Sequence, residues 1–445
     1  MKHLTRGGQL LSLAAKARWA WLPTRIRAYT HAIFIAFLLL ALLVPTWRSG
    51  PFTWWPIWPV PARDGHTAAL GALALLPGLI ATGWLLHRIV ERPRRPWRWG
   101  RVDIMLPLLG LTLLGLSSLE PALTWRTVAQ GIGLGLTWLI YLFLVNERPA
   151  IVTPLALVVL TQGAVAVGQF LNQRDLGLRA LGELDLDPRL PGTSILWARG
   201  TAWLRAYGLT GHPNNLGATL AILILWFLPH LEETRGWRRA GLIVSLSVGC
   251  LGLLASFSRA SWVAFLVGLA LWLRHASRRN GSPWALLLVF GGMLWLYRDL
   301  AAARFLSLNI PIEARSVYER LRDGYLALRL VADHPWRGVG LGNYLTVARS
   351  LQPDAFVVHN VPLLVAAELG LPGAAMWLWL TLIPLVRRLN VPFAWMAPWL
   401  AMHLIGLFDI TLWPTTTVRS AIVFAIVIAT YAGRLLPGEC HADRL

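Results

Sequence analysis

His359 and the residue that follows it, Asn360, are the positions in this sequence best suited to proton transfer. Asn360 can cap a helix, Pro362 is tolerated only in a first helical turn, and Gly370 would end the run. His359 would then lie at the positive end of a helix dipole, where the neutral imidazole is favoured over the imidazolium. A neutral imidazole can accept a proton, so a general base is chemically plausible at this position. From these residues alone, a hydrogen-bonded structural histidine is the favoured interpretation, and the general base is the alternative.

Several arginines precede this histidine on a segment that we expect to form a helix over residues 315–334. Arg315, Arg322 and Arg329 share one side of that helix at seven-residue spacing, whereas Arg320 points elsewhere. The expected apolar face comprises Val317, Leu321, Tyr325, Leu328 and Ala332. Guanidinium groups can bind a phosphate through two parallel hydrogen bonds. A solvated basic face is the other interpretation of such a row.

Further polar residues lie where apolar runs begin. Arg259 stands in SFSRASW between two apolar runs, and an arginine so close to hydrocarbon is costly unless it snorkels or has a partner. Arg205 and Asn214 precede another apolar run. Asn214 or Asn215 can cap the helix that begins there, and contact with a substrate is the alternative. Arg259, Arg205 and Asn214 are therefore candidate ligand-binding residues.

The motifs predict neither a cofactor nor a metal. Gly338, Gly340 and Gly342 in WRGVGLGNY lack the strand and helix that a dinucleotide fingerprint requires, so a tight turn or an anion-binding nest of amides fits better. The sequence LDLD at 184–187 comes nearest to a metal site, but the expected outer loops have no cluster of histidine and acidic residues suited to Mg²⁺. We therefore expect a site that works without a metal ion.

The composition is that of a polytopic membrane protein. Of the 445 residues, 56% are hydrophobic and 14% are charged, and the mean hydropathy is +0.55, which excludes soluble classes. The net charge of +20 comes from short basic clusters between apolar runs, as in juxtamembrane anchors. We expect membrane lipids and phosphorylated lipids as partners, and no nucleic acid. The two cysteines, Cys250 and Cys440, indicate neither a disulfide nor redox chemistry.

Hydropathy predicts an all-α protein with about twelve transmembrane helices in a single membrane domain over residues 1–445. The expected span centres are Phe37, Leu76, Leu109, Leu136, Val159, Ile222, Val248, Val267, Val289, Leu378, Leu400 and Ile426. Arginine-rich and arginine-poor connectors alternate, so the positive-inside rule places both termini in the cytoplasm. Two long loops, 172–214 and the largely helical 298–370, would lie on the outer side. The basic tail 1–30 and the tail 434–445 would be cytoplasmic.

The sequence HNVPLLVAAELGLPG, which begins at His359, resembles the histidine motif of the O-antigen ligase and O-antigen polymerase-like family. In that motif His-Asn is followed by nine residues and then Gly-x-x-Gly. Ala374 departs from the Gly, Thr or Tyr that ligases usually have at the next position. Three further pieces occur in the family's order: GHPNNLG, SFSRASW and an arginine ahead of ADHPWRGVGLGNY. The resemblance extends over residues 205–409, and the N-terminal half agrees only in topology.

This resemblance implies a metal-independent, inverting glycosyltransferase of the GT-C type in the bacterial cytoplasmic (inner) membrane, with its active site on the periplasmic side. Such enzymes pass a glycan from undecaprenyl diphosphate to a hydroxyl acceptor. The acceptor is the lipid A core of lipopolysaccharide for ligases and a second carrier-linked glycan for polymerases. His359 would be the general base or would bind acceptor and phosphate, while Arg259 and Arg320 would stabilise the diphosphate. The further substrate-binding candidates are Arg205, Arg315, Arg322, Asn214 and Asn360.

Several alternatives stay open. Spacing favours Arg320 as the family's third-motif arginine, although Arg315 and Arg322 are near enough to compete. The sequence does not separate a ligase from a polysaccharide polymerase or from an enzyme that glycosylates proteins. A small-anion, bicarbonate-like transporter is the alternative of another class, but transport would place ionisable groups near the middle of the membrane. The glycosyltransferase hypothesis instead requires Arg259, Arg320 and His359 to converge in one cavity.

Overall fold

The computed structural model describes residues 22–43, 76–90, 102–117, 125–198, 200–275, 282–306, 311–386, 393–414 and 416–434. Most of the two expected cytoplasmic tails, 1–30 and 434–445, lies outside these residues. Several connectors between expected spans also lie outside them, and the predictions made for those parts stay predictions.

The described helices are α2 (Leu22–Leu43), α4 (Leu76–Val90), α5 (Val102–Ser117), α6 (Trp125–Glu147), α7 (Val152–Asn172), α8 (Pro213–Glu233), α9 (Gly236–Ala255), α10 (Arg259–His275), α11 (Ser282–Leu296), α12 (Arg298–Leu306), α13 (Pro311–Asp333), α14 (Tyr344–Leu351), α15 (Val361–Val386), α16 (Phe393–Gly406) and α17 (Val418–Arg434). Between α7 and α8 lie a 3-10 turn, η1 (Arg179–Leu181), and two strands, β1 (Ile195–Ala198) and β2 (Thr201–Leu204). Each of the twelve expected span centres falls in one of these helices. The described part of the chain is therefore mostly helical, as predicted.

Within the described residues, four helices are long and apolar enough to cross a membrane: Val152–Asn172, Pro213–Glu233, Gly236–Ala255 and Val361–Leu382. A fifth span would combine α11 and α12, whose axes differ by 81° on either side of a break at Tyr297. Shorter apolar helices add Ala28–Leu43, Ile104–Gly115, Gly133–Glu147 and Val418–Ala432. These helices fit a membrane protein, because a helix satisfies all its backbone polar groups internally. Twelve complete spans remain a prediction.

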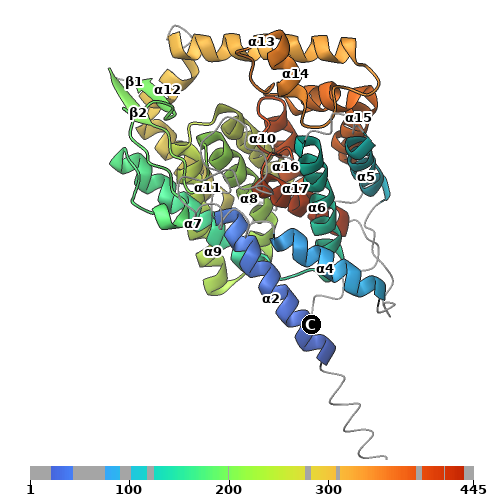
Figure 1. Ribbon diagram of the computed structural model, residues 1–445. Helices are drawn as coiled ribbons and strands as arrows, with labels where there is room; N and C mark the ends of the chain where they lie inside the picture. Colours follow the sequence, from blue (N-terminus) through green and yellow to red (C-terminus); the bar gives the residue numbers. More distant parts are fainter. Residues whose placement is uncertain are drawn as a thin grey trace, which may run out of the picture.

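Helix α8 lies at the centre of the bundle (Figure 1), where it packs against α7, α9, α10, α16 and α17. All of its residues from Leu216 to Leu228 are buried. A helix that is apolar on every side suits such an enclosed position. Its central place gives the polar residues at its first turn a fixed location at one end of the bundle.

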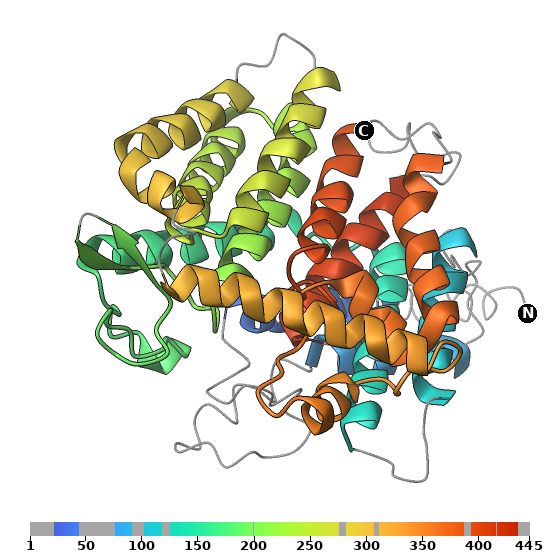
Figure 2. The same ribbon diagram turned by 90° about the horizontal axis from the view of Figure 1, so that it is seen from above.

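The segments that we expect on the outer side gather at the same end of the bundle as that first turn of α8 (Figure 1). Helix α13 lies across this end, and Figure 2 shows it crossing over the helices beneath. The β-hairpin and α12 lie together at one side of the same end, and they contact each other. The two long loops of the sequence therefore share one end of the molecule.

The β-hairpin is a departure from the all-α prediction. β1 and β2 pair in antiparallel fashion, from Ile195 opposite Leu204 to Ala198 opposite Thr201. Gly200 has a φ of 73°, a left-handed conformation that tight hairpin turns favour and that glycine adopts without strain. Strands of four residues are too short to change a hydropathy profile, so the sequence analysis missed them.

The predicted helix over 315–334 corresponds to α13, and its predicted apolar face points away from the bundle. Leu321, Tyr325 and Leu328 are 70%, 68% and 60% exposed. The residues buried on the opposite side are Asp323, Leu326, Ala327 and Leu330. This narrower stripe is the side on which α13 packs against its neighbours, α14 and α15. Periodicity thus predicted the helix correctly but gave no indication of which side is covered.

Gly370 interrupts the helical run that begins at Val361, as the sequence indicated, and α15 continues as a second helical segment beyond this kink. Its φ and ψ are 69° and −172°, a combination that is essentially confined to glycine. A Cβ atom at this position would lie 2.6 Å from the carbonyl group of Trp336, and the Leu371 amide donates to the Pro335 carbonyl at 2.7 Å. The segment that follows α13 therefore packs directly against the bend.

Candidate functional site

His359 and Asn360 lie at the start of α15, at the end of the bundle that we expect on the outer side. Asn360 caps the helix as predicted, because its Oδ1 accepts a hydrogen bond from the Leu363 amide at 2.9 Å. Its Nδ2 donates to the Leu407 carbonyl at 3.0 Å, which ties α15 to the loop after α16. The half-buried His359 has a buried Nδ1 with no hydrogen-bond partner among the described residues. Because buried polar atoms usually have a partner, this nitrogen is a candidate for contact with a bound molecule.

Asn214, in the first turn of α8, connects an acid with an arginine. Its Nδ2 donates to Oδ2 of the buried Asp409 at 2.7 Å, and its Oδ1 accepts from Nη2 of the buried Arg205 at 2.7 Å. Arg205 also donates through Nε to the Ser256 carbonyl at 3.0 Å. Asp409 receives a further hydrogen bond from the Thr411 amide at 2.9 Å. Asn214 therefore links the carboxylate of Asp409 to the guanidinium of Arg205.

His212 caps α8, so the suggestion that Asn214 or Asn215 does so is wrong. The Nδ1 atom of His212 accepts a hydrogen bond from the Asn214 amide at 3.1 Å, and Pro213 occupies the first helical position. Proline suits that position because it has no amide hydrogen to lose, and it shifts the cap to the residue before it. The Asn214 side chain is thereby left for Arg205 and Asp409.

Two glutamines one heptad apart on α7 hold the loop that carries Arg205 and His212. The Oε1 atom of Gln169 accepts from the amides of Tyr207 and Gly208 at 3.0 and 2.8 Å. The Oε1 atom of Gln162 accepts from the Leu209 amide at 2.8 Å. Both glutamines are buried, so their hydrogen bonds are well protected from water. The backbone between Arg205 and His212 is therefore positioned by a helix outside the loop.

The charged groups of the site act on one another. Burial lowers the pKa of His359, the Asp409 carboxylate raises it, and the Arg320 guanidinium lowers it, so the pKa lies below its ordinary value. Burial raises the pKa of Asp409, but the charge of His359 and the hydrogen bond from Thr411 outweigh it and bring that pKa below its usual range. Burial likewise lowers the pKa of His212, on which Arg205 and Asp409 also act. These mutual effects place the groups in one electrostatic neighbourhood.

Arg320 is the arginine of α13 that acts on both His359 and Asp409. Its side chain is half-buried and forms no hydrogen bond or ion pair with any residue that the structure describes. A guanidinium group has five N–H donors, so those of Arg320 are available to a ligand. Arg320, which spacing favours over Arg315 and Arg322, therefore stays a candidate for binding an anionic ligand.

Arg259 joins the site through a residue that the sequence analysis did not select, Arg304 of α12. Nη1 of Arg259 donates to the Arg304 carbonyl at 3.2 Å, and Nε of the buried Arg304 donates to the Phe257 carbonyl at 3.0 Å. The charge of Arg304 also acts on His212. Arg304 lies within an apolar run, AARFL, so the criterion that selected Arg259 would have found it.

The other arginines of α13 differ from Arg320. Arg322 forms ion pairs with Asp323, at 2.9 Å, and with Asp354, and it also donates to the Asp354 carbonyl at 2.8 Å. These contacts connect α13 with the segment before His359, which is a structural role. The side chain of Arg315 lies outside the described part of the structure.

Two acidic residues of the loop between α7 and α8 form ion pairs with arginines. Asp185 and Asp187 of the LDLD sequence form ion pairs with Arg179 at 2.9 Å and Arg189 at 2.7 Å. Within the described residues, no three His, Cys, Asp or Glu side chains are grouped so that they could hold a metal ion. Catalysis without a metal is still an expectation, which an activity measurement can test.

The structure thus brings His359, Asp409 and Arg320 into one neighbourhood and joins Arg205 to it through Asn214. Arg259 lies at the edge of this group, beyond Arg304. Histidines and arginines gathered at one end of an apolar helical bundle define a helical membrane protein with a basic site, which suits an anionic ligand.

Residues 242–378 match the family model described as O-Antigen ligase. The match confirms the predicted resemblance over that stretch, which is less than half of the chain. The matched region includes the candidates Arg259, Arg320 and His359, whereas Asn214 and Asp409 lie outside it. No curated protein matches the chain.

Proposed function

We propose that this protein transfers a glycan from undecaprenyl diphosphate to a hydroxyl acceptor at the outer face of the bacterial cytoplasmic membrane, as a step of polysaccharide or lipopolysaccharide biosynthesis. The family match over residues 242–378 supports the class of reaction. The observation that carries the proposal is the buried Nδ1 of His359, which has no described partner and lies in the same electrostatic neighbourhood as Arg320. A base and a cation together are what this reaction requires.

In the proposed reaction, the acceptor hydroxyl gives its proton to His359 while its oxygen bonds to the anomeric carbon of the glycan. The bond between that carbon and the diphosphate oxygen breaks, and the diphosphate leaves with the electron pair. Attack from the face opposite the leaving group inverts the anomeric configuration. Burial and the charge of Arg320 favour the neutral imidazole, which is the form that can accept the proton.

The arginines supply the positive charge that the leaving diphosphate needs. We assign direct contact to Arg320, because its N–H groups have no described partner, and to Arg259 and Arg304 from the other side of the site. Guanidinium groups in fixed positions stabilise developing charge without reorganising during the reaction. This assignment makes the reaction metal-independent, so activity should persist in EDTA.

Asp409 is assigned a supporting role toward His359. Its carboxylate raises the pKa of His359 and therefore stabilises the imidazolium that forms as the acceptor loses its proton. Asn214 donates a hydrogen bond to Asp409 at 2.7 Å, and Arg205 in turn donates one to Asn214 at 2.7 Å. This chain of two hydrogen bonds holds Asp409 in place. We therefore assign Asn214 and Arg205 to positioning and not to direct contact with the glycan.

The acceptor decides between a ligase and a polymerase, and the family supports both. The test is to incubate the purified protein with a carrier-linked glycan and two acceptors, lipid A core and a second carrier-linked unit. Glycan on lipid A core identifies a ligase, and a lengthened carrier-linked glycan identifies a polymerase. If neither acceptor gains glycan from a donor that a known ligase can use, the proposed function is wrong.

We further propose a GT-C-like arrangement of twelve spans, with both termini in the cytoplasm and α13 in the periplasm. A cysteine at Leu321, which is 70% exposed on α13, should react with a membrane-impermeant maleimide added to intact cells from which the outer membrane has been removed. A cysteine at Trp237, which is 80% exposed in the first turn of α9, should react only after the cells are lysed. Both variants would be made in a protein without Cys440. The reverse labelling pattern would place the site in the cytoplasm.

A further inference from the structure

The kink at Gly370 leaves two carbonyl groups of α15 without the partners that an unbroken helix would give them. The carbonyl of Glu368 would accept from the amide four residues later, but Pro372 has no amide hydrogen. The carbonyl of Ala367 loses its usual partner as well, because the Leu371 amide donates to the segment that follows α13. Buried carbonyl groups need partners, so the kink creates two acceptor positions at one point of the helix.

The glycine-rich segment between α13 and α14 supplies those partners. The Val339 amide donates to the Ala367 carbonyl at 2.9 Å. The Gly340 amide donates to the Glu368 carbonyl, also at 2.9 Å. Gly338 has a φ of 64°, and a Cβ atom there would lie 2.4 Å from the Glu368 carbonyl group, so only glycine allows this close approach. The backbone of the segment is therefore docked directly on the kink.

The side chain of Glu368 binds the same segment a second time. Its buried carboxyl group accepts hydrogen bonds from the backbone amides of Gly342 and Tyr344. Tyr344 is the first residue of α14, and the N-cap residue before it, Asn343, makes no side-chain capping hydrogen bond. Successive amides of a glycine-rich turn form a nest that suits an acid. The nest that the glycine spacing suggested is thus filled by an acid of the protein itself.

Tyr344 transmits this contact to α13. Its buried hydroxyl donates to the Asp323 carbonyl at 2.8 Å, and Arg320 lies one turn earlier on the same helix. The carboxylate of Asp323 also accepts from the Phe356 amide at 3.3 Å, three residues before His359. One chain of hydrogen bonds thus connects the kink of α15 with the part of α13 that carries Arg320 and with the segment before His359.

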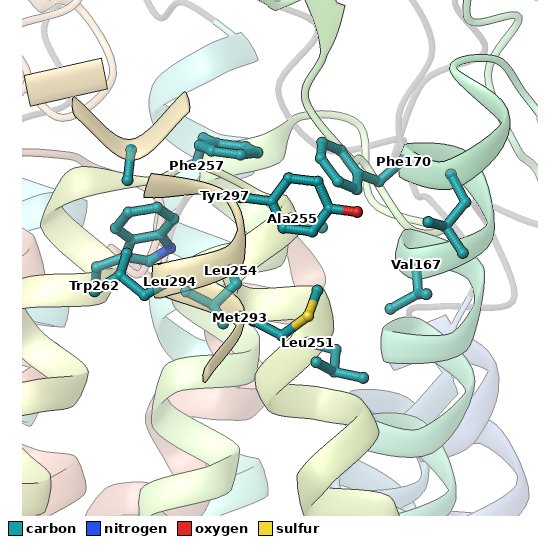
Figure 3. Close-up of a pocket in the computed structure, with 12 residues that line it drawn as sticks. Val167, Phe170, Leu251, Leu254, Ala255, Phe257, Trp262, Met293, Leu294 and Tyr297 are labelled. Carbon is teal, nitrogen blue, oxygen red and sulfur yellow. The ribbon is translucent and has the colours of Figure 1, made fainter. Parts of the chain in front are cut away.

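A different part of the bundle holds the other arginines of the site. Nε of Arg304 donates to the Phe257 carbonyl, and the Phe257 ring lies 5.6 Å from that of Phe170 on α7, measured between centroids. Figure 3 shows these two rings beside the apolar hollow between α7, α9 and α11. Helix α13 instead packs against α14 and α15. The place of Arg320 in the site therefore depends on how α13 is attached to these two helices.

We propose that Glu368 is a positioning residue that fixes the spacing between Arg320 and His359. It acts through Tyr344 and Asp323 and does not touch the substrate. The inference rests on the proposed function, in which Arg320 contacts the diphosphate and His359 takes the acceptor proton. Both groups serve one reacting centre, and a misplacement of about 1 Å can cost roughly 100-fold in rate.

The spacing can be measured without glycan transfer. Spin labels on cysteines at Leu321 of α13 and Leu378 of α15, which are 70% and 55% exposed, report the distance between the two helices by double electron–electron resonance. Labels at Leu157 of α7 and Val244 of α9, which are 48% and 56% exposed, form the matched control pair. All four cysteines would be introduced into a protein without Cys440.

Glu368→Leu keeps a side chain of similar size and removes the hydrogen-bond acceptors. It should shift or broaden the distribution of distances between α13 and α15 and leave the distribution between α7 and α9 unchanged. Should this variant fail to fold, Tyr344→Phe removes only one hydroxyl and should cause a smaller change in the same distribution. For whichever variant is measured, an unchanged distance between α13 and α15, or equal changes in the two pairs, would overturn the proposal.

Glycan transfer then shows whether the spacing matters for the reaction. Glu368→Leu should lower kcat by about ten- to 100-fold. Glu368→Gln should lose much less, because its side-chain oxygen can still accept from both amides. In an Arg320→Ala background, Glu368→Leu should cause little further loss, since the group that it positions is already absent.

A general structural role predicts other results. It would make Glu368→Leu lower kcat by the same factor with and without Arg320, and that outcome would refute the positioning role. Equal losses for the leucine and glutamine variants would refute it too, because an acceptor oxygen would then not be what matters. If the wild-type protein transfers no glycan to either acceptor, the proposed function is wrong, whereas the distance measurement still decides whether Glu368 fixes the spacing of α13 and α15.

Discussion

His359→Ala and Asn360→Ala should impair different properties of the protein. We expect the first to lower activity and the second to lower stability. His359 has a hydrogen bond with the Val357 backbone, but its Nδ1 has no described partner, so His359→Ala should cost the protein less stability than Asn360→Ala does. Asn360 caps α15 at 2.9 Å and binds the Leu407 carbonyl at 3.0 Å. Loss of the cap costs about 0.5–2 kcal/mol, and loss of the second hydrogen bond about 0.5–1.5 kcal/mol more. We therefore expect Asn360→Ala to lower the stability of the protein more than His359→Ala does.

For glycan transfer, in contrast, we expect His359→Ala to cause the larger loss and Asn360→Ala the smaller one. A positioned general base contributes about 10²- to 10⁴-fold to a rate, which corresponds to roughly 3–5 kcal/mol of transition-state stabilisation. His359→Ala should lower kcat by that factor. Asn360→Ala should lower kcat by less, because this variant keeps the imidazole of His359. The assay combines glycan transfer under saturating donor with thermal unfolding of each variant in the same lipid nanodiscs. Transfer by His359→Ala within about ten-fold of wild type, or a loss of stability as large as that of Asn360→Ala, would refute the assignment of a base.

Three further predictions concern the surroundings of the base. Asp409→Asn removes the charge that raises the pKa of His359, so the acidic limb of the pH profile of kcat/KM should move to lower pH. We also expect kcat to fall. An acidic limb that stays in place would contradict the interaction between Asp409 and His359. Arg259→Lys should lose nearly as much transfer as Arg259→Ala if the guanidinium binds phosphate with two hydrogen bonds, and full activity of the lysine variant would indicate simple snorkelling. Gly370→Ala should lower the unfolding free energy by about 1–3 kcal/mol or more, since its φ is 69° and a Cβ would meet Trp336 at 2.6 Å; an unchanged unfolding transition would contradict this packing.

Much of the fold could be predicted because hydropathy and helix capping are local properties of the sequence. Every expected span centre falls in a helix, and Asn360 caps α15 as its spacing indicated. The membrane-span count could not be settled in this way, since several of the helices are shorter than the roughly 20 residues that a full crossing needs. The β-hairpin was missed because its strands are too short to give a signal.

The candidate site was predicted less completely because its contacts are not local. Asn214 was expected to cap α8 or bind substrate, but Pro213 gives the cap to His212 and leaves Asn214 between Arg205 and Asp409. No sequence pattern pairs residues 195 positions apart, as Asn214 and Asp409 are. Arg304 was missed even though its place within the apolar run AARFL is the same kind of signal that selected Arg259.

The hydrogen bonds from α7 limit which segments of this protein can be exchanged with those of a similar protein. Gln162 and Gln169 hold the loop that carries Arg205, yet both lie before the family-matched residues 242–378, and Asp409 lies after them. The matched stretch is thus not a self-sufficient module. A chimera that exchanged it alone between two such proteins would inherit the proposed base and the proposed phosphate-binding arginines without the residues that hold their surroundings in place. Swaps designed to alter substrate choice should therefore exchange α7, α8 and the turn after α16 as one set.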